Sequence, residues 1–426
     1  MIIHTVKKGE TLFSIGALYN VSPLLLSQNN DVESDSLVEG QDIVVQIPKI
    51  VHTVTEGETL FSIATQYGVT AVNLLQNNPV IVKNGLIYPG ETIVIEYEEE
   101  KNGVLAVNGY VYPYVNKSVL IRNLPYLSFI TIFTYGFTTE GELIGIDDED
   151  IIRIATDYGV APIMLISTLG ENGAFSNELA SQLLNNTETQ DILIDNILEN
   201  MRAKGYKGLD VDFEYVFPED KENYIQFVSN LTQTLNSEGF FVMTALAPKV
   251  SSEQEGLLYE AHDYSGLGAA SNAVLIMTYE WGYTYGPPMA VAPINNVRRV
   301  VEYAVTQIPN DKIFMGLPFY GYDWTLPFVQ GSKARSMGSV TAVSIARRTG
   351  SVIQYDEEAQ TPFFNYTDNM TGREHVVWFE NARSIQAKLE LIKEFDLIGT
   401  GIWNVMRYFP EGWLVINALF NIYKVL

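Results

Sequence analysis

The 426-residue sequence predicts an α/β protein in which two small α+β modules, each βααβ, precede a (β/α)8 TIM barrel. Two observations predict this fold: a duplicated segment within the first 97 residues, and eight apolar runs separated by amphipathic stretches from Val104 onward. Near-continuous apolar strands that alternate with helices indicate a parallel sheet covered by helices on its outer side. We therefore expect a first module at residues 1–48, a second at 51–97 and the barrel at 103–426.

The duplicated segment begins at His4, where HTVKKGETLFSIGALYNVS recurs as HTVTEGETLFSIATQYGVT from His52. In each unit a short strand leads into Gly-Glu-Thr, where Thr11 or Thr59 is placed to cap a helix. A second helix, a glycine turn and an apolar strand follow. The two strands of each unit are expected to pair as a small antiparallel sheet.

Both repeats resemble the LysM module, whose pattern runs from HTV and GETLFSIA through LLQNN to PGETIVI. The resemblance implies binding of N-acetylglucosamine-containing glycans, peptidoglycan or chitin, through the loop after the first strand and the loop after the second helix. The contacts that it implies are Gly9, Thr11, Asn29, Asn30, Gly57, Thr59, Asn77 and Asn78. An alternative for the asparagines is that they only terminate helices, because Asn is a common turn residue. Two modules on one chain would gain avidity on a polymer.

The eight expected barrel strands begin at Val104, Leu127, Ala161, Gly208, Phe240, Ala273, Ile313 and Gly399. An open doubly wound sheet is the alternative, but no Gly-rich phosphate loop follows the first strand. The stretch at about 325–375 is too long for one loop and is expected to be a small insertion that shapes one side of the cleft. The polar segment from Tyr97 to Gly103 is expected to be a short linker.

The fourth barrel strand, GLDVDFEY, carries Asp210, Asp212 and Glu214 in alternation with Val211 and Phe213. A period of two places the three carboxylates on one face, towards the barrel interior. Burial of adjacent like charges is costly and raises their pKa values, which indicates a function. Two alternatives are a solvated edge strand and a metal site, for which the sequence offers no convincing His partner.

Acid catalysis requires a carboxyl group whose pKa lies near the working pH. Glu214, at the end of the strand, is the natural acid, and Asp212 on the same face is placed to share its proton.

The segment KGLDVDFE resembles the DGxDxDxE signature of glycoside hydrolase family 18, the chitinase-like barrels. The resemblance implies retaining, substrate-assisted hydrolysis, in which the 2-acetamido carbonyl of the sugar attacks the anomeric carbon. Glu214 would protonate the leaving oxygen and later activate water, Asp212 would stabilise the oxazolinium intermediate, and Asp210 would support Asp212. This sequence departs from the family pattern at Lys207, where the signature has its first Asp, and at STLG (167–170), where the family has SxGG.

Further positions carry the same resemblance. The segment MTYEW, which begins at Met277, resembles the family motif MxYD. The resemblance implies that Met277 and Glu280 contact the sugar and that Tyr279 acts in catalysis by a hydrogen bond to the acetamide oxygen. Trp403 matches the tryptophan that floors the sugar subsite, although a Trp at a strand end is often only a core residue.

Composition excludes several classes of function. A formal net charge of −25 disfavours nucleic acid as a partner, because such binding depends on clustered Lys and Arg. The absence of cysteine and the scattering of the four histidines predict no metal and no cofactor. No apolar run reaches the roughly 20 residues of a membrane span, so no membrane partner is expected. The N-terminus lacks a signal-peptide core, which indicates either a mature fragment or a protein that reaches its target without ordinary secretion.

Two LysM repeats ahead of this barrel resemble the spore cortex-lytic enzymes of spore-forming bacteria. That resemblance implies N-acetylglucosaminidase activity on cortex peptidoglycan or its fragments and a location in the spore; protein partners are not indicated. Two alternatives remain: a chitinase-like glycan-binding protein without activity, and a chitinase that acts on chitin oligomers.

Overall fold

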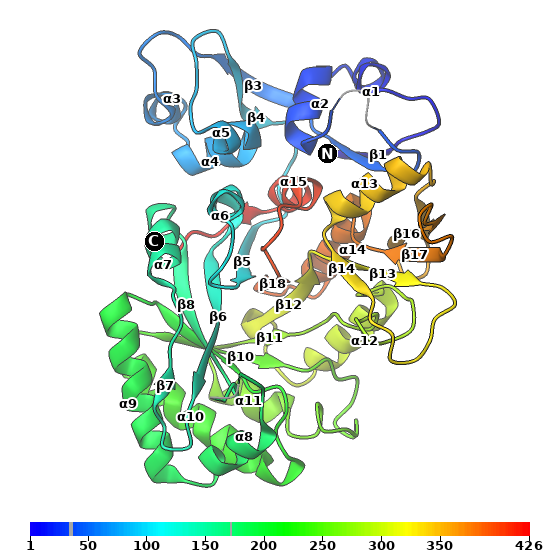
Figure 1. Cartoon of the computed structure of the whole chain (residues 1–426). Helices are drawn as coiled ribbons and strands as arrows, with labels where there is room; N and C mark the ends of the chain where they lie inside the picture. The colour runs from blue at the N-terminus through cyan, green and yellow to red at the C-terminus, as the bar shows by residue number, and fades with distance from the viewer. Residues whose placement is uncertain (34–36, 171–172) are drawn as a thin grey trace.

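The computed structural model describes residues 1–33, 37–170 and 173–426 (Figure 1). Eight strands form the barrel, all paired in parallel, and the ring closes because the first strand bonds both the second and the last. They are β5 (Val104–Val111), β6 (Phe129–Phe137), β8 (Ala161–Ser167), β9 (Gly208–Asp212), β10 (Phe241–Leu246), β11 (Ala273–Ile276), β12 (Ile313–Pro318) and β18 (Gly399–Trp403). The short strands β7 (Leu143–Ile144) and β19 (Asn421–Ile422) extend this sheet. The predicted (β/α)8 fold class is confirmed.

Helices surround the strands, as expected for apolar parallel strands. They are α6 (Lys117–Asn123), α7 (Glu149–Asp157), α8 (Asn177–Leu184), α9 (Thr187–Lys204), α10 (Lys221–Ser237), α11 (Tyr264–Ala270), α12 (Ile294–Ala304), α14 (Ala382–Glu394) and α15 (Pro410–Leu419), with 3-10 turns at Leu124–Tyr126, Pro218–Asp220 and Asn310–Lys312. Among the described residues, no helix is long and apolar enough to cross a membrane.

Each repeat has the expected strands and helices. The first contains β1 (Ile2–Thr5), α1 (Leu12–Tyr19), α2 (Pro23–Asn30) and β2 (Asp42–Val45); the second contains β3 (Pro48–Thr53), α3 (Leu60–Tyr67), α4 (Ala71–Asn77), α5 (Pro79–Asn84) and β4 (Thr92–Tyr97). Thr11 and Thr59 cap their helices through capping boxes, as the sequence predicts. Helix α5 is additional: Pro79 at its first position and Gly85 after its end are the signals that define it.

A second, five-stranded sheet leaves the barrel directly after β12. It contains β13 (Gly321–Thr325), β14 (Arg335–Met337), β15 (Gln354–Asp356), β16 (Thr361–Thr367) and β17 (Glu374–Trp378), with α13 (Ser339–Thr349) beside it. All its pairings are antiparallel. We call residues 321–378 the insertion sheet.

The polar segment between the second repeat and the barrel is packed rather than free. Glu99 forms an ion pair with the N-terminal amine at 3.0 Å, and Lys101 donates to Asn417 on α15 at 3.2 Å. Figure 1 shows both repeats against one side of the barrel, with α15 beneath them. The segment therefore fixes the repeats to the barrel instead of tethering them loosely.

Candidate active site

Strand β9 presents its acids as the alternation predicts. Val211 and Phe213 are fully buried in the outer core, and Phe213 stacks on Tyr224 and Phe227 of α10. Asp210 and Asp212 lie on the opposite face. The paired part of β9 ends at Asp212, so Glu214 lies just beyond it, at the carboxyl end of the strand where barrel enzymes carry their catalytic groups.

The backbone that carries Glu214 is held by a buried histidine. His262 accepts a hydrogen bond from the amide of Ala247 at 2.9 Å through Nδ1, so its Nε2 carries the proton and donates to the carbonyl of Phe213 at 3.1 Å. Burial lowers the pKa of His262 to about 4, which keeps the ring neutral. This role of His262 could not be predicted from the sequence, because it depends on a contact between segments that are distant in the chain.

The three acids lie in surroundings that favour their protonated forms. Burial raises the pKa of Asp210 to about 7, against a 2.6 Å hydrogen bond from Tyr110 that lowers it. Burial, then the charges of Glu214 and Asp210, raise the pKa of Asp212 well above its ordinary value. Burial and the charge of Glu280 raise the pKa of Glu214. The cluster is thus able to hold and exchange protons near neutral pH.

Glu280 follows β11 and has a left-handed backbone, with φ 68°. Its side chain is open to the cleft, and its Oε1 accepts hydrogen bonds from the hydroxyls of Tyr320 and, at 3.0 Å, Tyr322. Surrounding protein raises the pKa of Glu280 by desolvation, and both hydrogen bonds oppose that rise. These tyrosines were missed as site residues; YGY directly after the seventh strand was the available signal.

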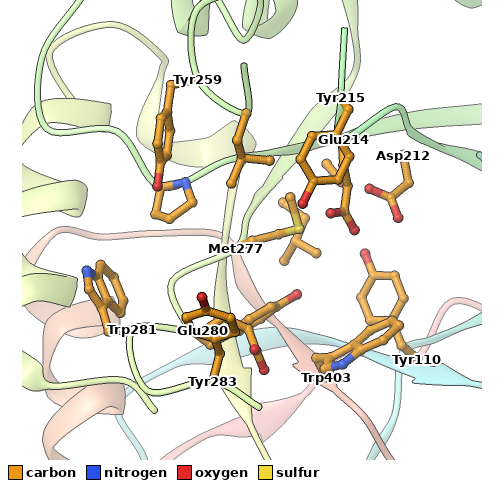
Figure 2. A pocket seen from close by; sticks show the side chains of 15 residues that line it. Tyr110, Asp212, Glu214, Tyr215, Tyr259, Met277, Glu280, Trp281, Tyr283 and Trp403 are labelled. Atoms are coloured by element: carbon orange, nitrogen blue, oxygen red, sulfur yellow. The ribbon is translucent and has the colours of Figure 1, made fainter. Parts of the chain in front are cut away.

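A cavity of about 560 Å³ joins these groups. Figure 2 shows the carboxyl groups of Asp212 and Glu214 directed into it, with Tyr110 and Trp403 on the facing wall. Its lining comprises Tyr110, Asp212, Glu214, Tyr215, Ala245, Pro248, Leu258, Tyr259, Leu275, Met277, Tyr279, Glu280, Trp281, Tyr283 and Trp403. The structure therefore brings all the predicted barrel residues together around the cavity except Asp210. Asp210 is fully buried and does not line the cavity.

Aromatic side chains form most of the cavity wall that sequence reasoning missed. Tyr215 and Tyr283 are exposed, while Trp281 and Tyr259 are partly covered. Exposed aromatic rings in a cleft provide flat apolar surfaces against which sugar rings pack. Their positions in loops after strands left no periodic signal that could have identified them.

The predicted glycan contacts in the repeats divide into two classes. Gly9 and Gly57 lie in open turns with φ of 80° and 84°, next to the capping residues Thr11 and Thr59.

The asparagines have structural roles. Asn30 and Asn78 are buried and bridge a helix to the closing strand: each side chain both donates to and accepts from one strand residue, Val44 or Val94. The remaining two also bond within the protein, Asn29 to Tyr97 and Asn77 to Ile95 and Asn417. These side-chain amides hold the fold, as the alternative of a structural role expects; glycan contact through the backbone amides of these loops stays a prediction.

The two departures from the family signature differ in position: STLG begins at Ser167, which pairs with Asp212 across β8 and β9, whereas Lys207 precedes β9. Lys207 is exposed ahead of β9, at the opposite end of the strand from Asp212. Within residues 1–33, 37–170 and 173–426, no group of three or more His, Asp or Glu side chains is arranged to hold a metal ion.

This fold and site are those of a glycoside hydrolase. The model described as Glycosyl hydrolases family 18 matches residues 109–407, and the LysM domain model matches residues 4–46 and 52–96. The chain therefore belongs to glycosyl hydrolase family 18 and carries two LysM domains.

Individual relatives extend the match to the whole chain. The chain is 43% identical over 429 residues to the cortical fragment-lytic enzyme of Bacillus subtilis, covering 100% of this chain and 99% of the relative. It is similar in structure to the spore cortex-lytic enzyme SleL of Bacillus megaterium, with a TM-score of 0.85, 36% identity and coverage of 100% and 99%. The chitinase of Chromobacterium violaceum matches with a TM-score of 0.69 and 25% identity, over 74% of this chain and 98% of that one.

Proposed function

We propose that this chain hydrolyses the N-acetylglucosaminyl bonds of bacterial spore cortex peptidoglycan, or of its fragments, with retention of anomeric configuration during germination. The observation that carries the proposal is the row of three acids on and after β9, none of which has a cationic partner among the described residues. Relatives of matching length and order are named for cortex lysis, which supports this substrate and a location in the spore.

Glu214 acts as the acid and then as the base. Because burial and Glu280 raise its pKa, Glu214 keeps a proton that it donates to the leaving glycosidic oxygen. The resulting carboxylate then accepts a proton from the water that completes hydrolysis. The hydrogen bond from His262 to the preceding carbonyl fixes its position relative to the sugar.

The sugar's own acetamide group supplies the nucleophile in this mechanism. Its carbonyl oxygen attacks the anomeric carbon, and Asp212 stabilises the positive charge of the oxazolinium that forms. Tyr279, buried against the acids, donates to the acetamide oxygen, and Asp210, held by Tyr110, supports Asp212. Trp403 provides the apolar floor, with Met277 and Glu280 at its edge.

The two LysM repeats bind the same polymer through their open first loops, at Gly9 and Thr11 and at Gly57 and Thr59. Both loops expose backbone and a neighbouring aromatic ring, with Phe13 and Phe61 largely exposed. With a net charge of −25, the chain gains no long-range attraction to an anionic wall polymer, so this binding depends on local contacts.

The test is mass-spectrometric analysis of the products that wild type and Glu214→Gln release from purified cortex fragments and, separately, from chitin oligomers. Wild type is expected to cleave after N-acetylglucosamine, and Glu214→Gln to turn over about 10²–10⁴-fold more slowly, because it lacks the proton for the leaving group. Glu222→Gln is the matched control, since Glu222 is exposed at the start of α10. Undiminished turnover by Glu214→Gln would exclude this mechanism, and intact binding without cleavage by wild type would favour a glycan-binding protein.

Chitin oligomers are the second candidate substrate, favoured by the similarity to a chitinase. Faster turnover of chitin oligomers than of cortex fragments of equal length would assign the activity to chitin. Oligomers whose 2-acetamido groups have been removed should not be cleaved, because they lack the internal nucleophile.

A further inference from the structure

Each repeat contains the same backbone turn just before its last strand, but the two turns lie in different surroundings. We call Val38–Gln41 the first turn and Tyr88–Glu91 the second turn. Three equivalent backbone hydrogen bonds hold each: Gln41 to Val38, Gly40 to Val6 and Val6 to Gln41 in one, and Glu91 to Tyr88, Gly90 to Val54 and Val54 to Glu91 in the other. The local structure of the two turns is therefore the same.

Their exposure differs at matched positions. Val38 is 6% exposed, whereas Tyr88 is 54% exposed. A Cβ atom added to Gly40 would lie 1.9 Å from the carbonyl oxygen of Ile353, whereas one added to Gly90 would meet nothing within 4 Å. Both glycines have φ near 90°, at 87° and 90°. Tertiary contact alone distinguishes the two turns.

The first turn is docked on the insertion sheet. Val38 packs in one apolar cluster with Met337 of β14, Ile353 and Phe379, and the amide of Ile353 donates to the carbonyl of Glu39 at 2.9 Å. This backbone bond explains why no side chain fits at Gly40.

A second attachment lies beside the first. Asp42, which follows the first turn, accepts from Nε of Arg383 on the barrel helix α14 at 2.9 Å, and the same guanidinium lies 3.9 Å from the ring centroid of Tyr355 on β15. Thr92 occupies the equivalent position in the second repeat and is exposed. The first repeat thus contacts the insertion sheet directly through Val38 and Glu39, and Asp42 is joined to it through Arg383 of α14.

The insertion sheet reaches the catalytic cleft through β13. Gly321 pairs with Met337 on one side, and Tyr322 pairs with Trp378 on the other. The cluster that holds Val38 therefore lies against the strand that places Tyr320 and Tyr322 on the Glu280 carboxylate. The apolar cluster around Val38 and the pairing of β13 with β14 and β17 thus connect the first repeat to the cleft.

We propose that the first repeat is a positioning element of the active site, whose turn at Val38–Gln41 holds the insertion sheet and thereby the two tyrosines on Glu280. The effect on turnover rests on the proposed function. In the second repeat the equivalent turn is open, and among the described residues nothing lies within 4 Å of a Cβ placed at Gly90.

The test compares Gly40→Ala with Gly90→Ala in the full-length chain. The two substitutions impose the same backbone strain, but only the first collides with Ile353. Gly40→Ala is expected to lower kcat/KM on a soluble oligosaccharide about threefold to tenfold, while Gly90→Ala leaves it unchanged.

The pH profile separates positioning from loss of stability. If the tyrosine hydrogen bonds weaken, the pKa of Glu280 rises, the group takes up a proton, and Glu214 loses the neighbouring charge that raises its pKa. The charged groups involved are Glu214 and, beyond Tyr322, Arg407. The alkaline limb of kcat/KM should then move to lower pH in Gly40→Ala and in Tyr322→Phe, but not in Gly90→Ala.

Hydrogen exchange gives a readout that does not require activity. Amides of residues 320–325 should exchange faster in Gly40→Ala than in wild type or Gly90→Ala. Should Gly40→Ala not fold, Val38→Ala gives the same comparison with a smaller change. Wild-type exchange and a wild-type pH profile in these first-turn variants would overturn the proposal; an inactive wild type with faster exchange in Gly40→Ala would overturn the proposed function alone.

Discussion

The protein holds two groups of carboxylates within its fold, and their surroundings differ. The catalytic group is Asp210, Asp212 and Glu214, which among the described residues has hydroxyl and carboxyl neighbours but no cation. The docking group lies between the first repeat and α15 and is formed by Asp31, Asp42 and Glu411.

The docking group is largely paired. Burial would raise the pKa of Asp31, but hydrogen bonds from Lys83 and Arg122 outweigh it and lower the pKa. For Asp42, burial has the larger effect: it raises the pKa of this carboxyl although the ion pair with Arg383 lowers it.

Glu411 shows that a raised pKa does not by itself identify a catalytic acid. Burial, followed by the charges of Asp42 and Asp31, raises its pKa to about 8, yet Glu411 does not line the cleft. Catalytic acids require both an unpaired environment and access to substrate.

The largest expected effect belongs to the catalytic group. Asp212→Asn should lower kcat about 10²–10³-fold, because the oxazolinium loses its anionic partner, without loss of folding free energy. Steady-state kinetics and urea unfolding of the same sample check this. A variant that unfolds more easily and keeps its turnover would place Asp212 with the docking group instead.

The sequence predicted the catalytic group because strand alternation is local: the period of two over Asp210, Asp212 and Glu214 determines which face they share. It did not predict Tyr322 on Glu280 or His262 behind Glu214, since these contacts join segments distant in the chain. The docking group was missed for the same reason. Asp42 and Thr92 occupy one position of a repeat, and only the neighbours in the folded chain make the first a buried ion pair.

The next effect is on stability. Arg383→Met should lower the free energy of unfolding by about 3 kcal/mol, because Asp42 is left buried without its partner. Turnover of a soluble substrate should fall no more than several-fold. Arg348→Met, at an exposed position of α13, is the control for the loss of a surface arginine; equal unfolding midpoints for the two variants would contradict the docking role.

A second effect on stability is expected from Glu411→Gln, and it depends on pH. The pKa of Glu411 is higher in the folded chain than the ordinary 4.5, so the protonated form is favoured and stability is lost as pH rises from about 4.5 to about 8. Replacement by Gln removes this loss. Unfolding free energy should increase on the order of 5 kcal/mol at about pH 9 and stay unchanged at about pH 4; a difference that does not vary with pH would show that Glu411 does not titrate in this range.

The smallest expected effect is a shift in the pH dependence of turnover when Glu280, in the cleft, loses its charge. Glu280→Gln should move the alkaline limb of kcat/KM to lower pH, because the charge that raises the pKa of Glu214 is lost. Glu280 is open to solvent in the cleft, so screening keeps the shift below about one pH unit. A limb that does not move would show that Glu280 is neutral in the wild-type enzyme.

The most direct test of the account is to measure turnover and unfolding free energy of Glu214→Gln in one preparation, at about pH 8. Because the pKa of Glu214 is raised in the fold, its ionisation costs stability as pH rises, and Gln avoids this cost. Turnover of Glu214→Gln should be about 10²–10⁴-fold lower than that of wild type, and its unfolding free energy should equal or exceed that of wild type. Retained turnover, or a loss of turnover that follows a loss of stability, would contradict the role of Glu214 as the catalytic acid.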